Sequence, residues 1–230
     1  MSEKEKNYLT LKEWALSQGM SLFGTADLVP FRHEAVRLSP ALLNTFASAI
    51  SLAVRLSDAV LEDIDDRPTE LYLHHYRQAN FFLDRVAFGL ALQIEQRGFA
   101  ALPVPASQIV NWERQQGHLS HKRAAVEAGL GWIGRNNLLV TPVHGARIRL
   151  VTVLTSLPLQ HDHPTDGGCG ECRRCIALCP AGAIRERRED FAHHVCYEQL
   201  CRFRKRDHIA QHICGVCVKA CSGERSTPSR

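Results

Sequence analysis

Four cysteines in the last third of the chain are spaced in a way that indicates metal chemistry. The stretch CGECRRCIALCP, residues 169–180, has the pattern C-x2-C-x2-C-x3-C-P. In iron–sulfur proteins with this pattern, three closely spaced thiolates hold one [4Fe–4S] cluster, and the cysteine before proline ligates a second cluster. A zinc site would instead use paired C-x2-C knuckles and four ligands in total. The spacing therefore predicts iron–sulfur clusters, and with them electron transfer, rather than zinc.

A second, shorter motif supplies further thiols. CGVCVKAC, residues 214–221, lacks one member of the first motif, so another thiolate must come from elsewhere, and Cys196 is favoured over Cys201. If the two motifs cross as they do in ferredoxins with two clusters, each cluster receives four thiolates. The predicted ligands are Cys169, Cys172, Cys175 and Cys221 for the first cluster, and Cys179, Cys196, Cys214 and Cys217 for the second. Cys201 is then a spare thiol.

The composition fits a metalloprotein with an ordinary apolar core. Of its 230 residues, 45% are hydrophobic, which is enough to build such a core. The nine cysteines are odd in number and all lie between Cys169 and Cys221, which favours a metal-binding module over disulfides. The start MSEKEKNYLT lacks the apolar stretch of a signal peptide, and no apolar run is long enough to span a membrane. We therefore expect a soluble, cytoplasmic protein with no membrane partner.

The net charge of +4 has two interpretations. A basic surface could bind nucleic acid. Basic side chains around anionic clusters explain the same excess equally well. Nucleic acid is therefore not favoured as a partner.

Helix and strand patterns alternate through the first part of the chain. Helices are expected over residues 10–19, 39–47 and 68–98, where Thr10 caps the first and Gly98 ends the last, and strands over 21–28, 48–56 and 99–105. Ser120 is expected to cap a helix that ends at Gly129, and the segments 136–142 and 146–156 to form a hairpin around PVHG. Such alternation predicts a layered α/β (α+β) domain. With a boundary in the polar, Pro- and Gly-rich segment 158–168, the predicted domains are 1–160 and 161–230.

Several of these motifs together resemble the epoxyqueuosine reductases and their shorter relatives. The resemblance rests on GMSLFGTADL, AAVEAGLGWIGRNNLLVTP, RIRLVTVLTSLPL, CYEQL and both cysteine motifs, and extends over nearly the full chain. It implies an α/β N-terminal domain of cobalamin-reductase type and a C-terminal ferredoxin-like domain with two [4Fe–4S] clusters. It also implies that the clusters reduce cobalt for a reductive reaction, and that Cys196 is the isolated ligand. The reductive dehalogenases are more distant relatives of the same two-module kind.

The chain departs from that family at three places. The family's general-acid Asp, thirteen residues before AGLGW, is replaced by Gln115. The sequence ends nine residues after Cys221, without the helical repeats that grip tRNA in the family. RNN follows AGLGWIG where the family usually has K-N-T or K-S. We therefore expect a substrate other than epoxyqueuosine in tRNA.

Residues near AGLGWIG are the candidates for cofactor and proton chemistry. His121 or Lys122 could donate a proton in place of the missing Asp, although Ser120 capping a helix with a basic first turn explains them equally well. The candidate cofactor-binding residues are Ser120, Gly131, Trp132, Arg135 and Asn136. Trp132 could instead belong to the core, and Arg135 and Asn136 could serve only a turn.

The sequence thus favours an iron–sulfur reductase that passes low-potential electrons to a cofactor in the N-terminal domain. That cofactor is expected to be cobalamin, with FMN as the weaker alternative. The expected partner is a low-potential donor such as ferredoxin or flavodoxin. The alternative is an electron-transfer or activator protein for a separate corrinoid or redox protein. The sequence predicts neither the substrate nor the oligomeric state.

Overall fold

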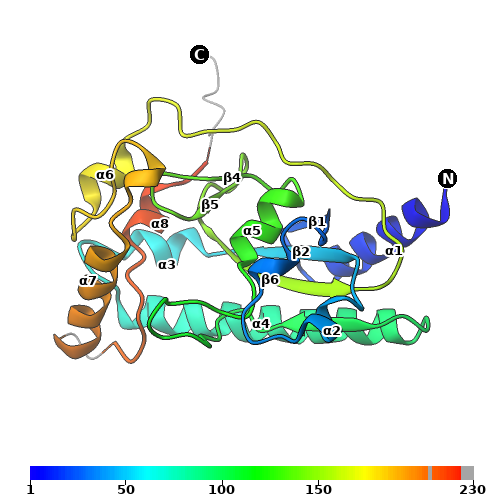
Figure 1. Cartoon of the computed structure of the whole chain (residues 1–230). Helices are drawn as coiled ribbons and strands as arrows, with labels where there is room; N and C mark the ends of the chain where they lie inside the picture. The colour runs from blue at the N-terminus through cyan, green and yellow to red at the C-terminus, as the bar shows by residue number, and fades with distance from the viewer. Residues whose placement is uncertain (207–208, 224–230) are drawn as a thin grey trace, which may run out of the picture. The chain divides into compact units, whose positions relative to one another are not determined.

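The computed structural model describes residues 1–206 and 209–223 (Figure 1). Contacts divide the chain into two compact units, each assembled from three segments. Unit 1 comprises Met1–Val54, Ala79–Leu130 and Arg149–Thr165, and unit 2 comprises Arg55–Gln78, Gly131–Ile148 and Asp166–Arg230. The predicted domains, 1–160 and 161–230, follow chain order instead, and that division stays a prediction. None of the helices in the described part of the chain has the length and apolar character needed to cross a bilayer.

Unit 1 is built on a four-stranded sheet of order β1-β2-β6-β3. The strands are β1 (Leu22–Asp27), β2 (Ser48–Arg55), β3 (Ala101–Val104) and β6 (Ile148–Thr155). β1 pairs antiparallel with β2, placing Leu22 opposite Ala53, and β3 pairs antiparallel with β6, placing Val104 opposite Thr152. β2 and β6 are buried along almost their whole length, as central strands covered on both faces should be.

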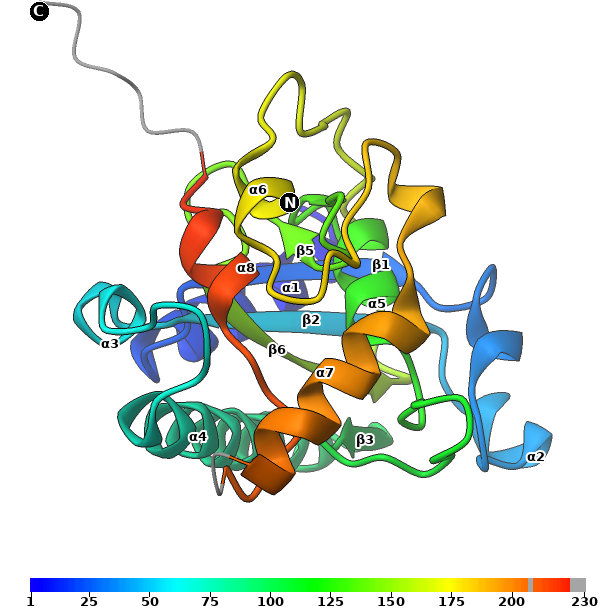
Figure 2. The ribbon, with the colours of Figure 1, turned by 90° about the vertical axis from the view of Figure 1, so that its left-hand side faces the viewer.

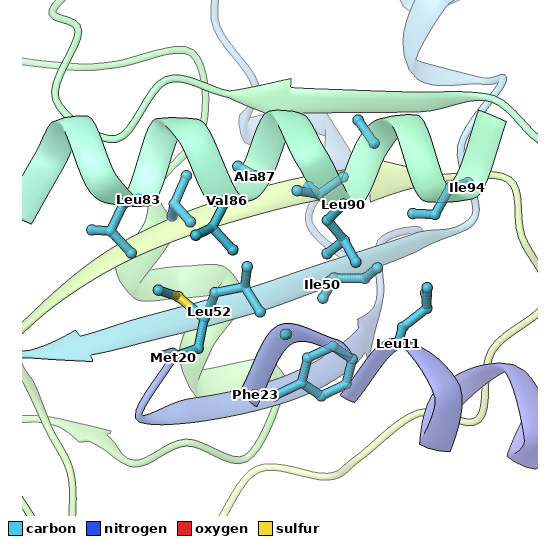
Figure 3. Close-up of a cluster of buried hydrophobic side chains, with 14 of the residues drawn as sticks. Leu11, Met20, Phe23, Ile50, Leu52, Leu83, Val86, Ala87, Leu90 and Ile94 are labelled. Atoms are coloured by element: carbon cyan, nitrogen blue, oxygen red, sulfur yellow. The ribbon is translucent and has the colours of Figure 1, made fainter. Parts of the chain in front are cut away.

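Helices cover both faces of this sheet. On one face, α1 (Glu3–Ser17) and α4 (Glu70–Glu95) supply apolar side chains to the main core. Figure 3 shows Leu83, Leu90 and Ile94 of α4 directed toward Ile50 and Leu52 of β2. On the other face lies α5 (His121–Glu127), which contacts β1 (Figure 2). Gly24 allows that approach, because a Cβ there would lie 2.3 Å from the carbonyl oxygen of Ala128.

Unit 2 consists of short helices and a small hairpin. Its helices are α3 (Asp58–Glu62), the first turns of α4, α6 (Arg174–Leu178), η2 (Arg188–Asp190), α7 (His193–Arg206) and α8 (Val216–Ala220). The hairpin joins β4 (Trp132–Ile133) to β5 (Leu139–Val140), with Trp132 opposite Val140. Two further short elements, η1 (Arg32–Glu34) and α2 (Pro40–Leu43), belong to unit 1.

Most predicted elements are confirmed. The long helix begins after Thr69, whose Oγ1 accepts from the backbone N–H of Tyr72 at 3.1 Å, and Gly98 follows it at φ +82°. α2 begins after Ser39, and the strands β1, β2 and β3 lie inside the predicted ranges. Ser120 caps α5 as expected.

Two predictions about elements were wrong. The first helix does not start at Thr10, because Ser2 and Glu5 form a capping box eight residues earlier and Thr10 lies within the helix. The predicted hairpin between 136–142 and 146–156 does not form. β5 instead turns back onto β4, whereas β6 pairs within the large sheet. β6, which has eight residues, lies between β2 and β3 in that sheet, and the two-residue β5 is too short to pair along it.

The polar segment in which the domain boundary was predicted is hydrogen-bonded to unit 1 at Asp162. The Asp162 carboxylate accepts from the backbone N–H of Thr25 at 2.9 Å and from the Tyr8 hydroxyl at 3.2 Å. Burial and the nearby Asp162 raise the pKa of Tyr8 to about 12, so its hydroxyl stays protonated. Residues around Asp162 therefore extend unit 1 alongside β1.

Candidate metal centre

Two short helices bring the cysteine motifs together in unit 2. α6 carries Cys175, α8 carries Cys217, and the two helices pack against each other. Cys175 lies in a small buried cluster with Ile184 and Ala220, and Cys179 and Cys217 pack against it. Segments about 40 residues apart in sequence thus meet in one place, as the crossing of the two motifs requires.

The thiols of the first predicted cluster influence one another. Burial, followed by the neighbouring thiols of Cys221, Cys169 and Cys172, raises the pKa of Cys175 to about 11. Burial likewise raises the pKa of Cys221, with Cys169 and Cys172 among the contributing groups. Cys172 is the exception, because hydrogen bonds from Arg174 lower its pKa. We call Cys169, Cys172, Cys175 and Cys221 the first thiol set.

The other four thiols form a second set by the same criterion. Burial, with smaller contributions from Cys196 and Cys179, raises the pKa of Cys214 to about 12. The pKa of Cys217 lies well above its usual range because of burial, followed by Cys214, Cys196 and Cys179, and lastly Cys175. We call Cys179, Cys196, Cys214 and Cys217 the second thiol set. Cys175 is therefore the member of the first set through which the two sets meet.

Cys201 differs from the other thiols of unit 2. It lies on α7, five residues after Cys196, and is not among the groups that shift the pKa of Cys172, Cys175, Cys196, Cys214, Cys217 or Cys221. Within residues 1–206 and 209–223, no three Cys, His, Asp or Glu side chains are grouped to hold a single metal ion. Cluster thiolates ligate different iron atoms, so they do not have to converge on one point.

Arg135 ties the AGLGWIG segment to the first cysteine motif. Its Nη1 donates to the carbonyl oxygen of Cys172 at 3.0 Å, and its Nη2 donates to that of Gly170 at 2.8 Å. Its Nε donates to the carbonyl oxygen of Glu186. One guanidinium thus fixes three loop carbonyls, which a lysine could not do with the same geometry. These contacts are with the cysteine loops, while the expected contact with a cofactor stays a prediction.

Asn136 makes the corresponding contact with the second motif. It is 4% exposed, its Nδ2 lies 3.5 Å from the carbonyl oxygen of Cys217, and its Oδ1 accepts from the backbone N–H of Leu138 at 3.2 Å. Gly134 faces the first motif, because a Cβ there would lie 3.4 Å from the Sγ of Cys169. The turn between β4 and β5 therefore contacts both cysteine motifs.

Gly131 and Trp132 lie at the start of this hairpin. A Cβ on Gly131 would lie 2.0 Å from the carbonyl oxygen of Val140, so the backbone approaches its partner strand here. The Trp132 ring lies against Gly167, whose Cβ would be 2.2 Å from the ring. Both residues thus have close packing partners within unit 2.

The three candidates at the start of α5 lie in unit 1. Ser120 Oγ accepts from the backbone N–H of Arg123 at 3.2 Å, as a helix cap. Burial lowers the pKa of Lys122. The ring of His121 is held from both sides, with Nδ1 2.8 Å from Thr152 Oγ1 and Nε2 3.0 Å from the carbonyl oxygen of Pro105. Because that carbonyl only accepts, the partners fit a neutral ring with the proton on Nε2.

His121 is expected to make stability depend on pH in mildly acidic solution. Burial lowers its pKa from 6.5 to about 4, with a smaller lowering by Arg149 and opposing effects of the Pro105 carbonyl and Asp84. Between these values the unfolded chain binds a proton that the folded chain does not, so stability falls as pH drops from 6.5 to 4. At about 1.4 kcal/mol per pKa unit, the full loss is about 3 kcal/mol.

Urea unfolding at several pH values measures this loss. His121→Gln should be less stable than the wild type at pH 7 and should lose less stability on acidification. His118→Gln is the control, since that ring also contacts a backbone carbonyl. An unchanged pH profile in His121→Gln would contradict the assignment.

The chain is similar in sequence to several known proteins. No family model matches it. An epoxyqueuosine reductase from Synechococcus sp. (strain RCC307) is 30% identical over 198 residues, covering 76% of this chain and 60% of the relative. The enzyme of the same name from Listeria monocytogenes is 40% identical over 68 residues, which are 30% of this chain and 18% of the relative. The chain belongs to an epoxyqueuosine reductase-like family. It spans less than two thirds of these relatives' lengths.

Solved structures show that the mixed α/β fold is shared. The epoxyqueuosine reductase from Streptococcus thermophilus matches with a TM-score of 0.61 and 22% identity, over 95% of this chain and 68% of that one. A catabolic reductive dehalogenase bound to 3-bromo-4-hydroxybenzoic acid matches with a TM-score of 0.76 and 19% identity, over 96% of this chain and 32% of that one. Another reductive dehalogenase structure, linked by its authors to B12-dependent dehalogenation, matches with a TM-score of 0.69 and 20% identity, over 80% of this chain and 26% of that one.

In this epoxyqueuosine reductase-like chain, Gln115 lies in a tight loop. Its φ is +55°, and its side-chain amide donates to the carbonyl oxygen of Trp112 within the loop closed by Asn111 and Gln116. Asn and Asp tolerate this backbone region better than most residues. The loop could therefore accept an Asp at this position, but the chain has an amide there.

One group that contacts the segments around the cysteines was not predicted from the sequence. Arg147 is 7% exposed, and its guanidinium binds Asp58 at 2.8 Å, Glu62 at 2.9 Å and the carbonyl oxygen of Lys219 at 3.1 Å. The next residue, Ala146, donates its N–H to the carbonyl oxygen of Cys221 at 3.0 Å. The one sequence feature that could have suggested this role is the position of Arg147 directly before an apolar strand.

Proposed function

We propose that the chain is an iron–sulfur oxidoreductase that carries two [4Fe–4S] clusters. The observation that carries the proposal is the packing of α6 against α8, which brings Cys175, Cys179 and Cys217 of the two motifs together. The donors fit, since four thiolates are what such a cluster requires. Bound clusters would supply single electrons at low potential. The chain's own contribution is to bury the thiols and to fix their loops through Arg135 and Asn136.

We further propose that the electrons serve a reductive reaction with cobalamin as the second cofactor. The support is the fold shared with a dehalogenase described as B12-dependent, and FMN is the weaker alternative. The side-chain polar atoms of Ser120, Arg135 and Asn136 are engaged by protein groups, so cobalamin binding by these residues stays a prediction. A predicted proton donor, His121, is neutral near pH 7 because its pKa is about 4.

The substrate proposed for this reaction is not epoxyqueuosine. Gln115 stands where the resemblance places a general acid, and a carboxamide has no proton to give at neutral pH. An alternative role, as an electron carrier or activator for a separate corrinoid protein, is consistent with the same substitution.

Anaerobic purification followed by iron and sulfide analysis, EPR and a cobalamin titration tests the proposal. About eight iron atoms per chain and two EPR-active clusters are expected. Tight cobalamin binding would favour the reductase, whereas full iron content without corrinoid binding would favour the carrier. Fewer than four iron atoms, or stoichiometric zinc, would overturn the iron–sulfur proposal. Incubation with epoxyqueuosine-containing tRNA should yield no queuosine. Conversion to queuosine would contradict the proposal that epoxyqueuosine is not the substrate.

The proposed electron donor is an acidic ferredoxin or flavodoxin that docks on α7. This helix contains Cys196 of the second thiol set, and near its end Arg202, Arg204 and Lys205 are exposed while Phe203 is buried. Basic residues at a helix end also favour the helix dipole, so their presence alone is weak support. Their position on a helix that supplies a cluster ligand makes them the favoured docking site.

Reversing charge at this site should slow electron entry. We expect Arg204→Glu with Lys205→Glu to reduce the rate of reduction by an acidic ferredoxin at least about tenfold at low salt, because steering by opposite charge is lost. Stopped-flow reduction at several salt concentrations measures it, and the rate with dithionite should stay unchanged. The matched control is Arg85→Glu with Arg97→Glu, both exposed in unit 1. Equal slowing by both pairs would show that only net charge matters.

A further inference from the structure

The indole N–H of Trp132 is buried without a hydrogen-bond partner. Among the described residues, four buried side-chain atoms have no hydrogen-bond partner, and they belong to Ser51, Asn80, Arg123 and Trp132. Of these, only Trp132 belongs to unit 2, where the cysteines lie. An unpaired buried donor costs free energy, and in native proteins such a group is commonly satisfied by a bound group or water. Trp132 therefore points to a missing acceptor in this unit.

The neighbours of Trp132 indicate which acceptor that is. Gly167 lies against the six-membered ring of the indole, since its Cβ would be 2.2 Å from Cε3 and 2.8 Å from Cζ3. The Nε1 atom belongs to the other, five-membered ring. Cys169 follows two residues after Gly167, and its Sγ lies 3.4 Å from the Cβ position of Gly134, two residues after Trp132.

Two short stretches of backbone thus run alongside each other. Residues two apart in an extended chain face the same side, so Trp132 and Gly134 share a face. Residues 167–169 lie across that face. The Trp132 ring thus lies against Gly167, two residues before Cys169 of the first set, and its buried donor has no protein acceptor.

We propose that Trp132 Nε1–H donates a hydrogen bond to a sulfur of the cluster held by Cys169, Cys172, Cys175 and Cys221. The inference rests on the proposed iron–sulfur function and makes Trp132 a residue that tunes one cluster. A donor to sulfur stabilises the reduced cluster, which has the greater negative charge, and so raises its reduction potential. The other cluster, held by the second thiol set, lacks this donor, so the two clusters should differ in potential.

Redox titration of Trp132→Phe, followed by EPR, tests the inference. The variant keeps an aromatic ring but has no N–H. We expect the midpoint potential of one cluster to fall while the other is unchanged, with a shift of up to about tenfold in the reduction equilibrium, or about 59 mV. Trp14→Phe is the matched control, because Trp14 is also half-buried but packs in unit 1 against Gly89.

A second measurement does not depend on the stability of the variant. Electron–nuclear double resonance of the reduced wild type, prepared in H2O and in D2O, should detect an exchangeable proton coupled to one cluster. 15N labelling of tryptophan should split or broaden that signal. Unchanged potentials in Trp132→Phe, or no indole coupling in the wild type, would overturn the inference while leaving the clusters in place. Absence of clusters by iron analysis would instead overturn the proposed function.

Discussion

Replacing Cys214 with serine is expected to remove one cluster and leave the other. Cys214 belongs to the second thiol set and lies one turn before Cys217 of α8. A serine hydroxyl is a poor ligand for iron at neutral pH, so the second set would retain only three thiolates. Iron analysis should show a fall from about eight to about four atoms per chain, and EPR of the reduced protein should lose the coupling between two clusters.

Cys201→Ser is the matched control for this experiment. The residue is a cysteine of the same unit and lies on the same helix as the ligand Cys196, yet it belongs to neither thiol set. Its replacement should leave iron content, EPR spectrum and stability unchanged. If Cys201→Ser removed a cluster and Cys196→Ser did not, the assignment of the isolated ligand would be wrong. If neither replacement had an effect, a ligand set of four thiolates would be contradicted.

Local signals were sufficient for most of the fold. Ser39 and Thr69 bond to the starts of their helices, and Ser120 caps α5, because a side-chain oxygen before a helical pattern satisfies free N–H groups in most contexts. The strands β1, β2 and β3 follow from runs of apolar residues between turn signals. Spacing also predicts that the two cysteine motifs cross, since the ligand pattern of a cluster is local in sequence apart from Cys196, and that assignment stays a prediction.

Long-range partners could not be predicted in the same way. β6 pairs with β3, nearly 50 residues earlier in the chain, and no local feature distinguishes that pairing from a hairpin with residues 136–142. Arg135 and Asn136 were expected to contact a cofactor or serve a turn, and the structure shows them bonded to carbonyl groups of cysteine segments up to about 80 residues away. The sequence identifies such polar residues as important but does not name their partners.

Replacing Arg147 with methionine is expected to destabilise unit 2 by about 3 kcal/mol. The guanidinium connects Asp58 and Glu62 of α3 to the carbonyl oxygen of Lys219 in α8, so the change removes charge-assisted hydrogen bonds to three residues. Breaking a buried ion pair typically costs about 3–5 kcal/mol. The lower end applies because the side chains of Asp58 and Glu62 remain 39% and 55% exposed and can be hydrated. Methionine keeps most of the buried aliphatic volume.

Urea unfolding of the anaerobically purified protein measures this loss, and Arg55→Met provides its control. Arg55 pairs with the same Asp58, but its side chain is 51% exposed, so its pair should contribute less than about 1 kcal/mol. The hydrogen bond from Arg147 is the main cause of the lowered pKa of Asp58. The contribution of this pair to stability is therefore complete at neutral pH, and it is lost only as pH falls through the lowered pKa. Equal effects of the two variants would show that exposure does not decide the strength of these pairs. A large loss of stability in Arg147→Met together with reduced iron content would show that Arg147 also holds the segment around Ala146, which is bonded to Cys221, in place.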